Sequence, residues 1–187
     1  MNPVKIILGL IPFALFSLLA ETIPVGWAAL VGLVAALVAV AIDIRTGLKA
    51  VPVVAVITMG AFAALAFVGE PAVAAVLGSY GRGLATLVLA AYILITSAFS
   101  PFTSAYAKES TPRQYWGSAE FVALNRRLSL AWGGTVLLMA AGHLVAEAIA
   151  TAGVTVPLIS AALNWGLPIF AIMKTVDYTK RAAQAAV

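Results

Sequence analysis

Five side chains that could do chemistry recur at helical spacing in one apolar part of the chain. They are Asn125, Ser129, Trp132, His143 and Glu147. At roughly 100° per residue they fall within about 60° of one another, and Thr135 lies about another 60° round the helix, at the edge of this stripe. Polar groups are costly in lipid, so the stripe is expected to face other helices or a water-filled cavity.

This stripe has two interpretations. It could line a transport pathway or a ligand groove, or it could supply hydrogen bonds between neighbouring helices, a role in which serine, asparagine and histidine are common. Residues 136–142 are wholly apolar, so the stripe is interrupted where the middle of the membrane would lie. That interruption favours hydrogen bonding between helices.

The only histidine has an acidic neighbour one helical turn away. A carboxylate such as Glu147 raises the affinity of an imidazole for protons, so His143 and Glu147 could shuttle protons. Both residues lie near the predicted outer end of their helix, where water is close, and a surface pair is the favoured interpretation. Asn164, near the middle of the last apolar run, needs a hydrogen-bonding partner and is a further candidate for lining a pathway.

Basic residues ahead of the stripe are candidates for binding lipid phosphates. Arg126 and Arg127 are adjacent at the start of the apolar run, and Lys108 lies in the polar segment before it. Such side chains can hold one anionic headgroup, or they can anchor the chain by contacting phosphates nonspecifically. The second interpretation is favoured.

Common enzyme signatures are missing from the sequence. It contains no glycine-rich phosphate loop, no His-Glu-x-x-His motif and no Gly-x-Ser-x-Gly motif, and it has one histidine and no cysteine. We therefore expect no catalytic residues, no cofactor and no metal centre. The net charge of +4 comes from scattered basic residues and does not indicate nucleic-acid binding.

A membrane-embedded helical bundle must position these residues. Of the 187 residues, 63% are hydrophobic and 10% are charged, whereas soluble domains have about 25% charged residues. Six spans cannot close a barrel, and open strands do not survive in lipid, so the spans must be helices. We predict an all-α polytopic fold, a single domain with spans at about 4–20, 25–42, 48–68, 84–106, 128–149 and 154–173.

The distribution of charge predicts the topology. With the N-terminus inside, ten of the eleven basic residues fall in inner segments, and only Arg82 falls outside. The outer connections otherwise carry Glu21, Glu70 and Glu147. Because cytoplasmic loops are rich in lysine and arginine, this asymmetry predicts about six spans with both termini in the cytoplasm.

Two connections are longer than tight turns, and one small-residue pattern predicts packing. Residues 69–83 are expected outside, with 72–77 as an interfacial helix or an extension of a neighbouring span. Residues 107–127 form a polar cytoplasmic segment, in which Ser118 is expected to cap a helix that continues into the fifth span. The second span carries four small residues that predict close helix packing rather than a wide pore: Gly32, Ala35, Ala36 and Ala39.

Two segments also carry short motifs. Residues 8–13 read Leu-Gly-Leu-Ile-Pro-Phe, and residues 121–142 contain Leu124-Asn125, Leu130-Ala131-Trp132 and Gly142. In these motifs, and in the order of its spans, the chain resembles the intracellular septation protein A family of bacterial inner-membrane proteins. The resemblance implies a multi-pass protein of the bacterial inner membrane, associated with the cell envelope or division and without established catalytic residues.

Three hypotheses on function remain open. The first is a non-enzymatic protein of the cell envelope that acts through other inner-membrane proteins or further copies of itself, in contact with membrane lipids. The second is a small transporter or channel for a proton, ion or small solute, lined by the fourth to sixth spans. The third is a lipid-modifying enzyme that holds phosphate with Arg126 and Arg127, although no acid–base pair accompanies them.

Overall fold

The computed structural model describes residues 3–153 and 157–185, and their secondary structure is all helical, as predicted. The long helices are α1 (Pro3–Leu19), α2 (Val25–Thr46), α3 (Ala50–Val68), α4 (Pro71–Thr96), α6 (Ala119–Thr151) and α8 (Leu167–Ala185). The short ones are α5 (Thr103–Lys108), the single turn η1 (Arg113–Tyr115), α7 (Pro157–Ala161) and the π-helical turn η2 (Ala162–Gly166).

Five helical segments are long and apolar enough to cross a membrane. They are Val25–Ile44, Ala50–Val68, Pro71–Thr96, Ala119–Thr151 and Pro157–Ala182. The apolar part of α1, Val4–Leu19, is shorter than these and lies near the lower limit of about 17 residues for a crossing helix. The chain is a multi-pass membrane protein, and the predicted count of six spans depends on α1.

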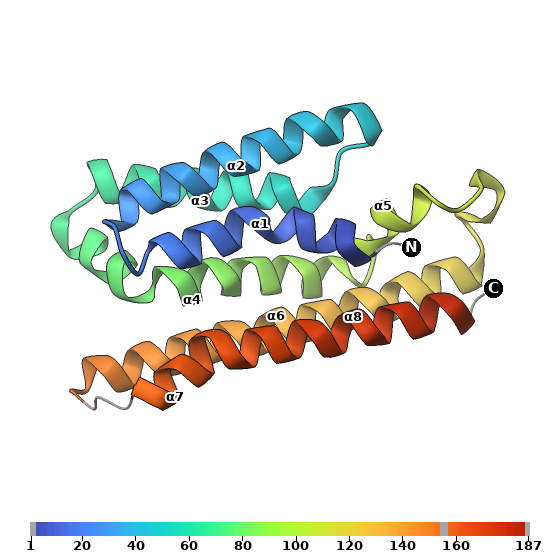
Figure 1. Cartoon of the computed structure of the whole chain (residues 1–187). Helices are drawn as coiled ribbons and strands as arrows, with labels where there is room; N and C mark the ends of the chain where they lie inside the picture. Colours follow the sequence, from blue (N-terminus) through green and yellow to red (C-terminus); the bar gives the residue numbers. More distant parts are fainter. Residues whose placement is uncertain (1–2, 154–156, 186–187) are drawn as a thin grey trace.

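Helices that follow one another along the chain pack side by side. In Figure 1, helices α1 to α4 form one group, while α6 packs along α4 and α8 packs along α6. Helix α4 joins the two parts, because it contacts α3 on one side and α6 on the other. The start of α1, the end of α8 and the short helix α5 lie at the same end of the bundle (Figure 1). This agrees with the prediction that both termini lie on one side of the membrane.

Helices α4 and α6 approach closely at glycines. A Cβ atom added at Gly83 would lie 2.6 Å from Cδ2 of Leu144, and one added at Gly133 would lie 2.7 Å from Cδ2 of Leu94. Small residues of this kind let helix backbones pack closely in a membrane, where lipid offers no hydrophobic driving force between helices. The contact between α4 and α6 therefore depends on these positions.

We expect Gly133→Ala to destabilise the protein, because the new methyl group would overlap Leu94 and Ile93. Overpacking typically costs about 1–3 kcal/mol. Gly134→Ala is the matched control, since nothing lies within 4 Å of a Cβ atom added there and alanine favours a helix by about 1 kcal/mol over glycine. Thermal unfolding of both variants in the same detergent measures the difference, and equal melting temperatures would contradict the packing described.

The fourth span begins earlier than predicted. Helix α4 starts at Pro71, so most of the connection expected at 69–83 is helical, and residues 72–77 extend this span. Proline is favoured in the first turn because the N–H it lacks would have no partner there. Arg82, expected in an outer loop, lies within α4. The glycines at the end of this stretch are packing positions, since Gly81 lies against Phe16 and Gly83 against Leu144.

The fourth span also ends earlier than residue 106. Helix α4 stops at Thr96, and residues 97–102 form turns before α5 begins. The hydroxyl groups of Thr96 and Ser97 donate hydrogen bonds to the carbonyls of Tyr92 and Ile93, at 2.7 and 2.6 Å. Pro101 has no N–H and cannot continue the helix. This break separates α5 from the membrane-spanning part of α4.

The last two spans extend past their predicted limits at the end that carries α5. Helix α6 begins at Ala119, and Ser118 caps it as predicted by accepting a hydrogen bond from the Phe121 amide at 3.1 Å. Helix α8 continues to Ala185 rather than ending near residue 173. The predicted start of this span, residue 154, lies outside the described residues. Both helices therefore carry charged turns beyond their apolar parts.

Candidate functional site

The predicted polar stripe on α6 faces the interior of the bundle. Asn125, Ser129, Trp132 and His143 are buried, whereas Glu147 is partly exposed. Three hydrogen bonds join residues of the stripe to residues of other helices. Thr103 Oγ1 of α5 donates to the Asn125 carbonyl at 2.8 Å and lies 3.0 Å from Ser129 Oγ, and Trp132 Nε1 donates to Thr179 Oγ1 of α8 at 3.2 Å. These side chains thus tie α6 to α5 and α8.

Thr135, at the edge of the stripe, and His143, toward its far end, also form hydrogen bonds with residues of other helical segments. The hydroxyl of Thr135 pairs with that of Thr175 on α8. His143 Nδ1 lies 2.9 Å from Asn164 Oδ1, in the π-helical turn η2, so the described partner of His143 is Asn164 rather than Glu147. The contacts of these residues are hydrogen bonds between helices, and a transport pathway along them stays a prediction.

The basic candidates do not converge in the structure. Arg126 and Arg127 are exposed in the early turns of α6. Lys108, at the end of α5, lies with its Nζ 5.0 Å from the centroid of the Trp116 ring, and Arg113 approaches the same ring at 5.6 Å. No described contact joins Lys108 to either arginine. A shared phosphate site for the three residues stays a prediction.

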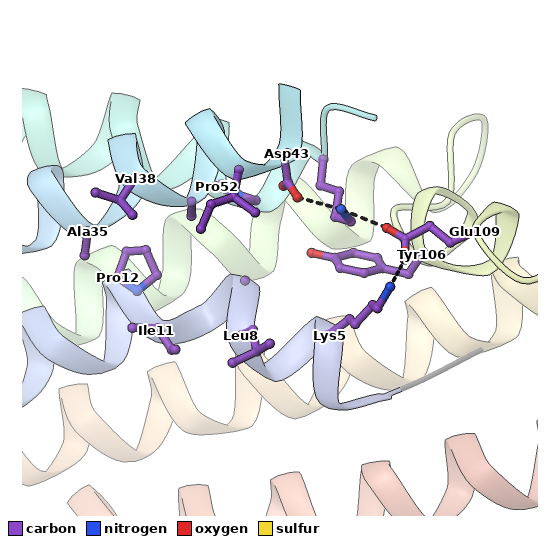
Figure 2. Close-up of a pocket in the computed structure, with 14 residues that line it drawn as sticks. Lys5, Leu8, Ile11, Pro12, Ala35, Val38, Asp43, Pro52, Tyr106 and Glu109 are labelled. Carbon is purple, nitrogen blue, oxygen red and sulfur yellow. Dashed lines mark hydrogen bonds and ion pairs between the residues drawn. The ribbon is translucent and has the colours of Figure 1, made fainter. Parts of the chain in front are cut away.

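A groove lies in the other half of the bundle, between α1 and α2. Its volume is about 470 Å³, and Figure 2 shows side chains of both helices along it. Nine of the residues that line it are apolar or small: Leu8, Gly9, Ile11, Pro12, Ala35, Val38, Ala39, Ile42 and Pro52. The remaining lining residues are charged or aromatic, and they gather at the end of the bundle that carries α5.

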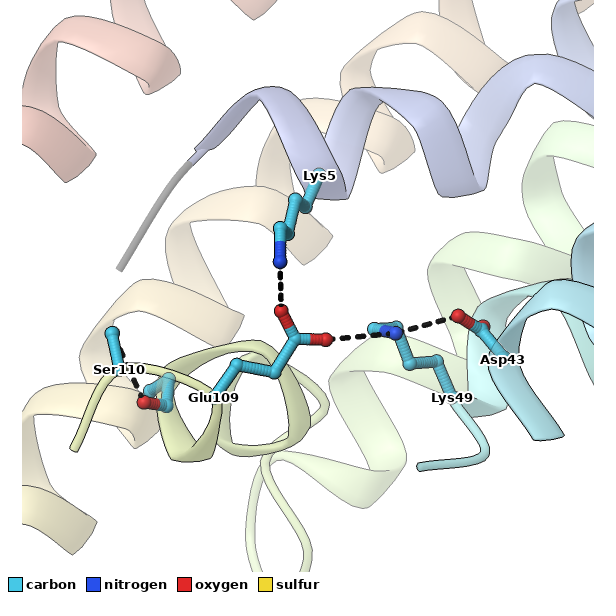
Figure 3. Close-up of polar contacts among 6 residues, drawn as sticks. Lys5, Asp43, Lys49, Glu109 and Ser110 are labelled. Atoms are coloured by element: carbon cyan, nitrogen blue, oxygen red, sulfur yellow. Dashed lines mark hydrogen bonds and ion pairs between the residues drawn. The ribbon is translucent and has the colours of Figure 1, made fainter. Parts of the chain in front are cut away.

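Four ionic side chains, here called the charged cluster, close that end of the groove: Lys5, Asp43, Lys49 and Glu109. Glu109 pairs with Lys5 of α1 and with Lys49, whose Nζ lies 2.9 Å from Glu109 Oε1 (Figure 3). Lys49 also pairs with Asp43 of α2, at 2.5 Å. The side chain of Lys49 is 8% exposed and that of Lys5 is 51% exposed. The cluster therefore has a buried centre and one open edge.

Mutual pairing favours the charged forms of Lys49 and Glu109. Burial alone would lower the pKa of Lys49, but its hydrogen bonds to Asp43 and Glu109 outweigh burial and raise the pKa above its ordinary value. Burial would raise the pKa of Glu109, but hydrogen bonds from Lys5 and Lys49 lower it below its ordinary value. Lys49 and Glu109 thus stay charged near neutral pH. A carboxylate held in this way is poorly suited to general acid–base catalysis.

Tyr106 of α5 lies beside the charged cluster at the wall of the groove. The residue is 3% exposed, and its hydroxyl has no hydrogen-bonding partner among the described residues. The hydroxyl is directed toward the groove (Figure 2) and lies against Gly9, where an added Cβ atom would be 2.6 Å from it. Burial, with a smaller contribution from the Asp43 and Glu109 carboxylates, raises the pKa of Tyr106. The phenol is therefore neutral and available for a hydrogen bond.

The groove was not predicted from the sequence, although part of its signal is present there. The polar pattern points to α4, α6 and α8, whereas the groove is built by α1, α2, the start of α3 and α5. Each member of the charged cluster lies next to an apolar run on the same predicted side of the membrane. Their pairing depends on how the helices are arranged, because Lys5 and Glu109 are 104 positions apart.

Comparison with known proteins gives no relative. The chain matches no protein-family model, and no significant match is found among curated proteins or solved structures. The resemblance to the septation protein A family therefore stays a prediction, and function has to be argued from the groove and its charged end.

Proposed function

We propose that the protein is a non-enzymatic, membrane-embedded binding protein whose groove holds the apolar chain of one amphiphilic molecule. The observation that supports the proposal is an apolar groove with a single polar end, formed by the charged cluster and Tyr106. An amphiphile has the same division into an apolar chain and a polar head. Membrane lipids were the partners expected from the sequence, and they are amphiphiles of this kind.

The size of the groove suits a single chain. Its volume of about 470 Å³ lies within the range of about 300–1,000 Å³ that is usual for small-molecule sites. The groove is lined by small residues of α2, Ala35 and Ala39, and by the ring of Pro12 on α1. An apolar chain gains little by moving from bulk lipid into a groove, so shape and the polar end must provide the selectivity.

A photoreactive lipid tests the proposal. We expect a single-chain alcohol with a diazirine in its chain, irradiated with the protein in bilayers, to label peptides of α1 and α2 that contain Pro12 and Ala39. Ala39→Phe places a ring in the groove and is expected to reduce this labelling about tenfold, which corresponds to a loss of about 1.4 kcal/mol in binding. Peptide mass spectrometry locates and quantifies the label.

Ala41→Phe is the matched control, because Ala41 is exposed on the same helix and does not line the groove. Labelling of this variant should equal that of the wild type. Labelling spread evenly over the lipid-facing helices, and unchanged in Ala39→Phe, would contradict the proposal. Transport and action through partner proteins remain hypotheses, and no described contact favours either.

A further inference from the structure

We infer that the amphiphile in the groove has an uncharged oxygen as its head, a hydroxyl or a carbonyl, which forms a hydrogen bond with Tyr106. The inference rests on the proposed function and names the chemical class of the ligand. It is carried by the unpaired phenol at the polar end of the groove and by the charge balance of the cluster beside it.

The Tyr106 hydroxyl is a buried polar group without a described partner. Leaving such a group unsatisfied costs about 1–3 kcal/mol, so buried hydroxyl groups are nearly always hydrogen-bonded. The hydroxyl is directed toward the groove, next to the end at which the charged cluster lies (Figure 2). An oxygen on the ligand at this end would supply the missing hydrogen bond, either as acceptor from the phenol or as donor to it.

The charged cluster disfavours a charged head. Its two lysines and two carboxylates balance, and each carboxylate contacts a lysine. A carboxylate or phosphate head would bring a third negative charge to two positive ones, and an ammonium head would do the reverse. A buried charge without a partner is strongly unfavourable. An uncharged oxygen avoids this cost and still satisfies the phenol.

Gly9 sets the position of the hydroxyl. A Cβ atom there would lie 2.6 Å from Tyr106 Oη, so any side chain at this position must displace the phenol. Gly9→Ala therefore moves the hydroxyl without removing it, whereas Tyr106→Phe removes it and keeps the ring. The two variants perturb the same hydrogen bond in different ways, and both should lose the preference for an oxygen head.

Competition between four probes of equal chain length tests the inference. Dodecanol, dodecanoic acid, dodecylamine and dodecane compete with the photoreactive alcohol at about pH 8, where the acid is ionised and the amine is protonated. For the wild type we expect dodecanol to compete at about tenfold lower concentration than dodecane, as one satisfied hydrogen bond would give. In Tyr106→Phe and Gly9→Ala, dodecanol should lose this advantage and compete at the same concentration as dodecane.

Tyr80→Phe is the control for removing a phenol elsewhere, because Tyr80 pairs with Thr151, away from the groove. An advantage of dodecanol that persists in Tyr106→Phe would overturn the inference. The inference would also be overturned if dodecanoic acid were the strongest of the four competitors, especially if Lys5→Met abolished its competition. If all four probes compete equally while Ala39→Phe still prevents labelling, the proposed function stands and the inference fails. Labelling that is the same in Ala39→Phe as in the wild type would contradict both the proposed function and the inference.

Discussion

Replacement of Lys49 by methionine is expected to lower the free energy of unfolding by about 3–5 kcal/mol. Lys49 is the centre of the charged cluster, with one contact to Asp43 and one to Glu109. Methionine keeps most of the length of the side chain but leaves the buried carboxylate of Asp43 without this cation, while Glu109 keeps its pair with Lys5. For a chain of this size, each kcal/mol corresponds to about 2–4 °C, so the melting temperature should fall by about 6–20 °C.

Two further variants separate the buried charge from the loss of a side chain. Lys5→Met removes the exposed partner of Glu109 and should cost less than about 1 kcal/mol, because solvent screens this pair. A triple variant, Asp43→Leu, Lys49→Met and Glu109→Gln, should recover most of the lost stability, since it leaves no buried charge without a partner, and the remaining cation, Lys5, has a side chain that is 51% exposed. A melting temperature of Lys49→Met equal to that of the wild type would show that the cluster does not form.

Trp132→Ala is expected to destabilise the protein by about 3–5 kcal/mol, the usual cost of truncating a fully buried tryptophan. Trp132 is 1% exposed and has the largest fully buried side chain among the described residues. It lies between α6 and α8, and its Nε1 donates to Thr179 Oγ1. Alanine would leave a cavity at this contact and a hydroxyl without its donor. Thermal unfolding in detergent measures the loss.

Trp132→Phe keeps much of the ring and removes the donor, so its cost should be nearer the value of about 0.6 kcal/mol measured on average for hydrogen bonds between membrane helices. Trp27→Ala is the control, because Trp27 is 57% exposed at the start of α2. If Trp132→Ala proves no more harmful than Trp27→Ala, the stripe on α6 does not hold α8 in place.

Much of the fold is predictable because lipid imposes strong rules on sequence. Apolar runs bounded by charge give the helices, and Ser118 gives the start of α6, since a capping serine satisfies an orphan amide. The incorrect predictions concern residue types that occur both in loops and in helix contacts. Gly81, Gly83 and Arg82 are typical of a loop, yet the glycines provide close contact and Arg82 pairs with Glu21 at 2.5 Å from within α4. Only the neighbouring helices distinguish these uses.

The candidate site is less predictable for the same reason. The stripe on α6 is correctly predicted to avoid lipid, but its pairing with Thr103, Thr175 and Thr179 on other helices was not predicted. Among the small residues of α2, Ala36 is fully buried as expected, whereas Ala35 and Ala39 line the groove. Packing and an open groove use the same residue types, so sequence alone does not separate them.

Native mass spectrometry of the protein extracted from its own membranes is the most direct measurement of ligand binding. We expect the wild type and Ala41→Phe to carry one single-chain amphiphile with an uncharged oxygen head, and Ala39→Phe to lack it. If the wild type and Ala39→Phe instead retain the same lipids in the same proportions, the groove between α1 and α2 is not a binding site.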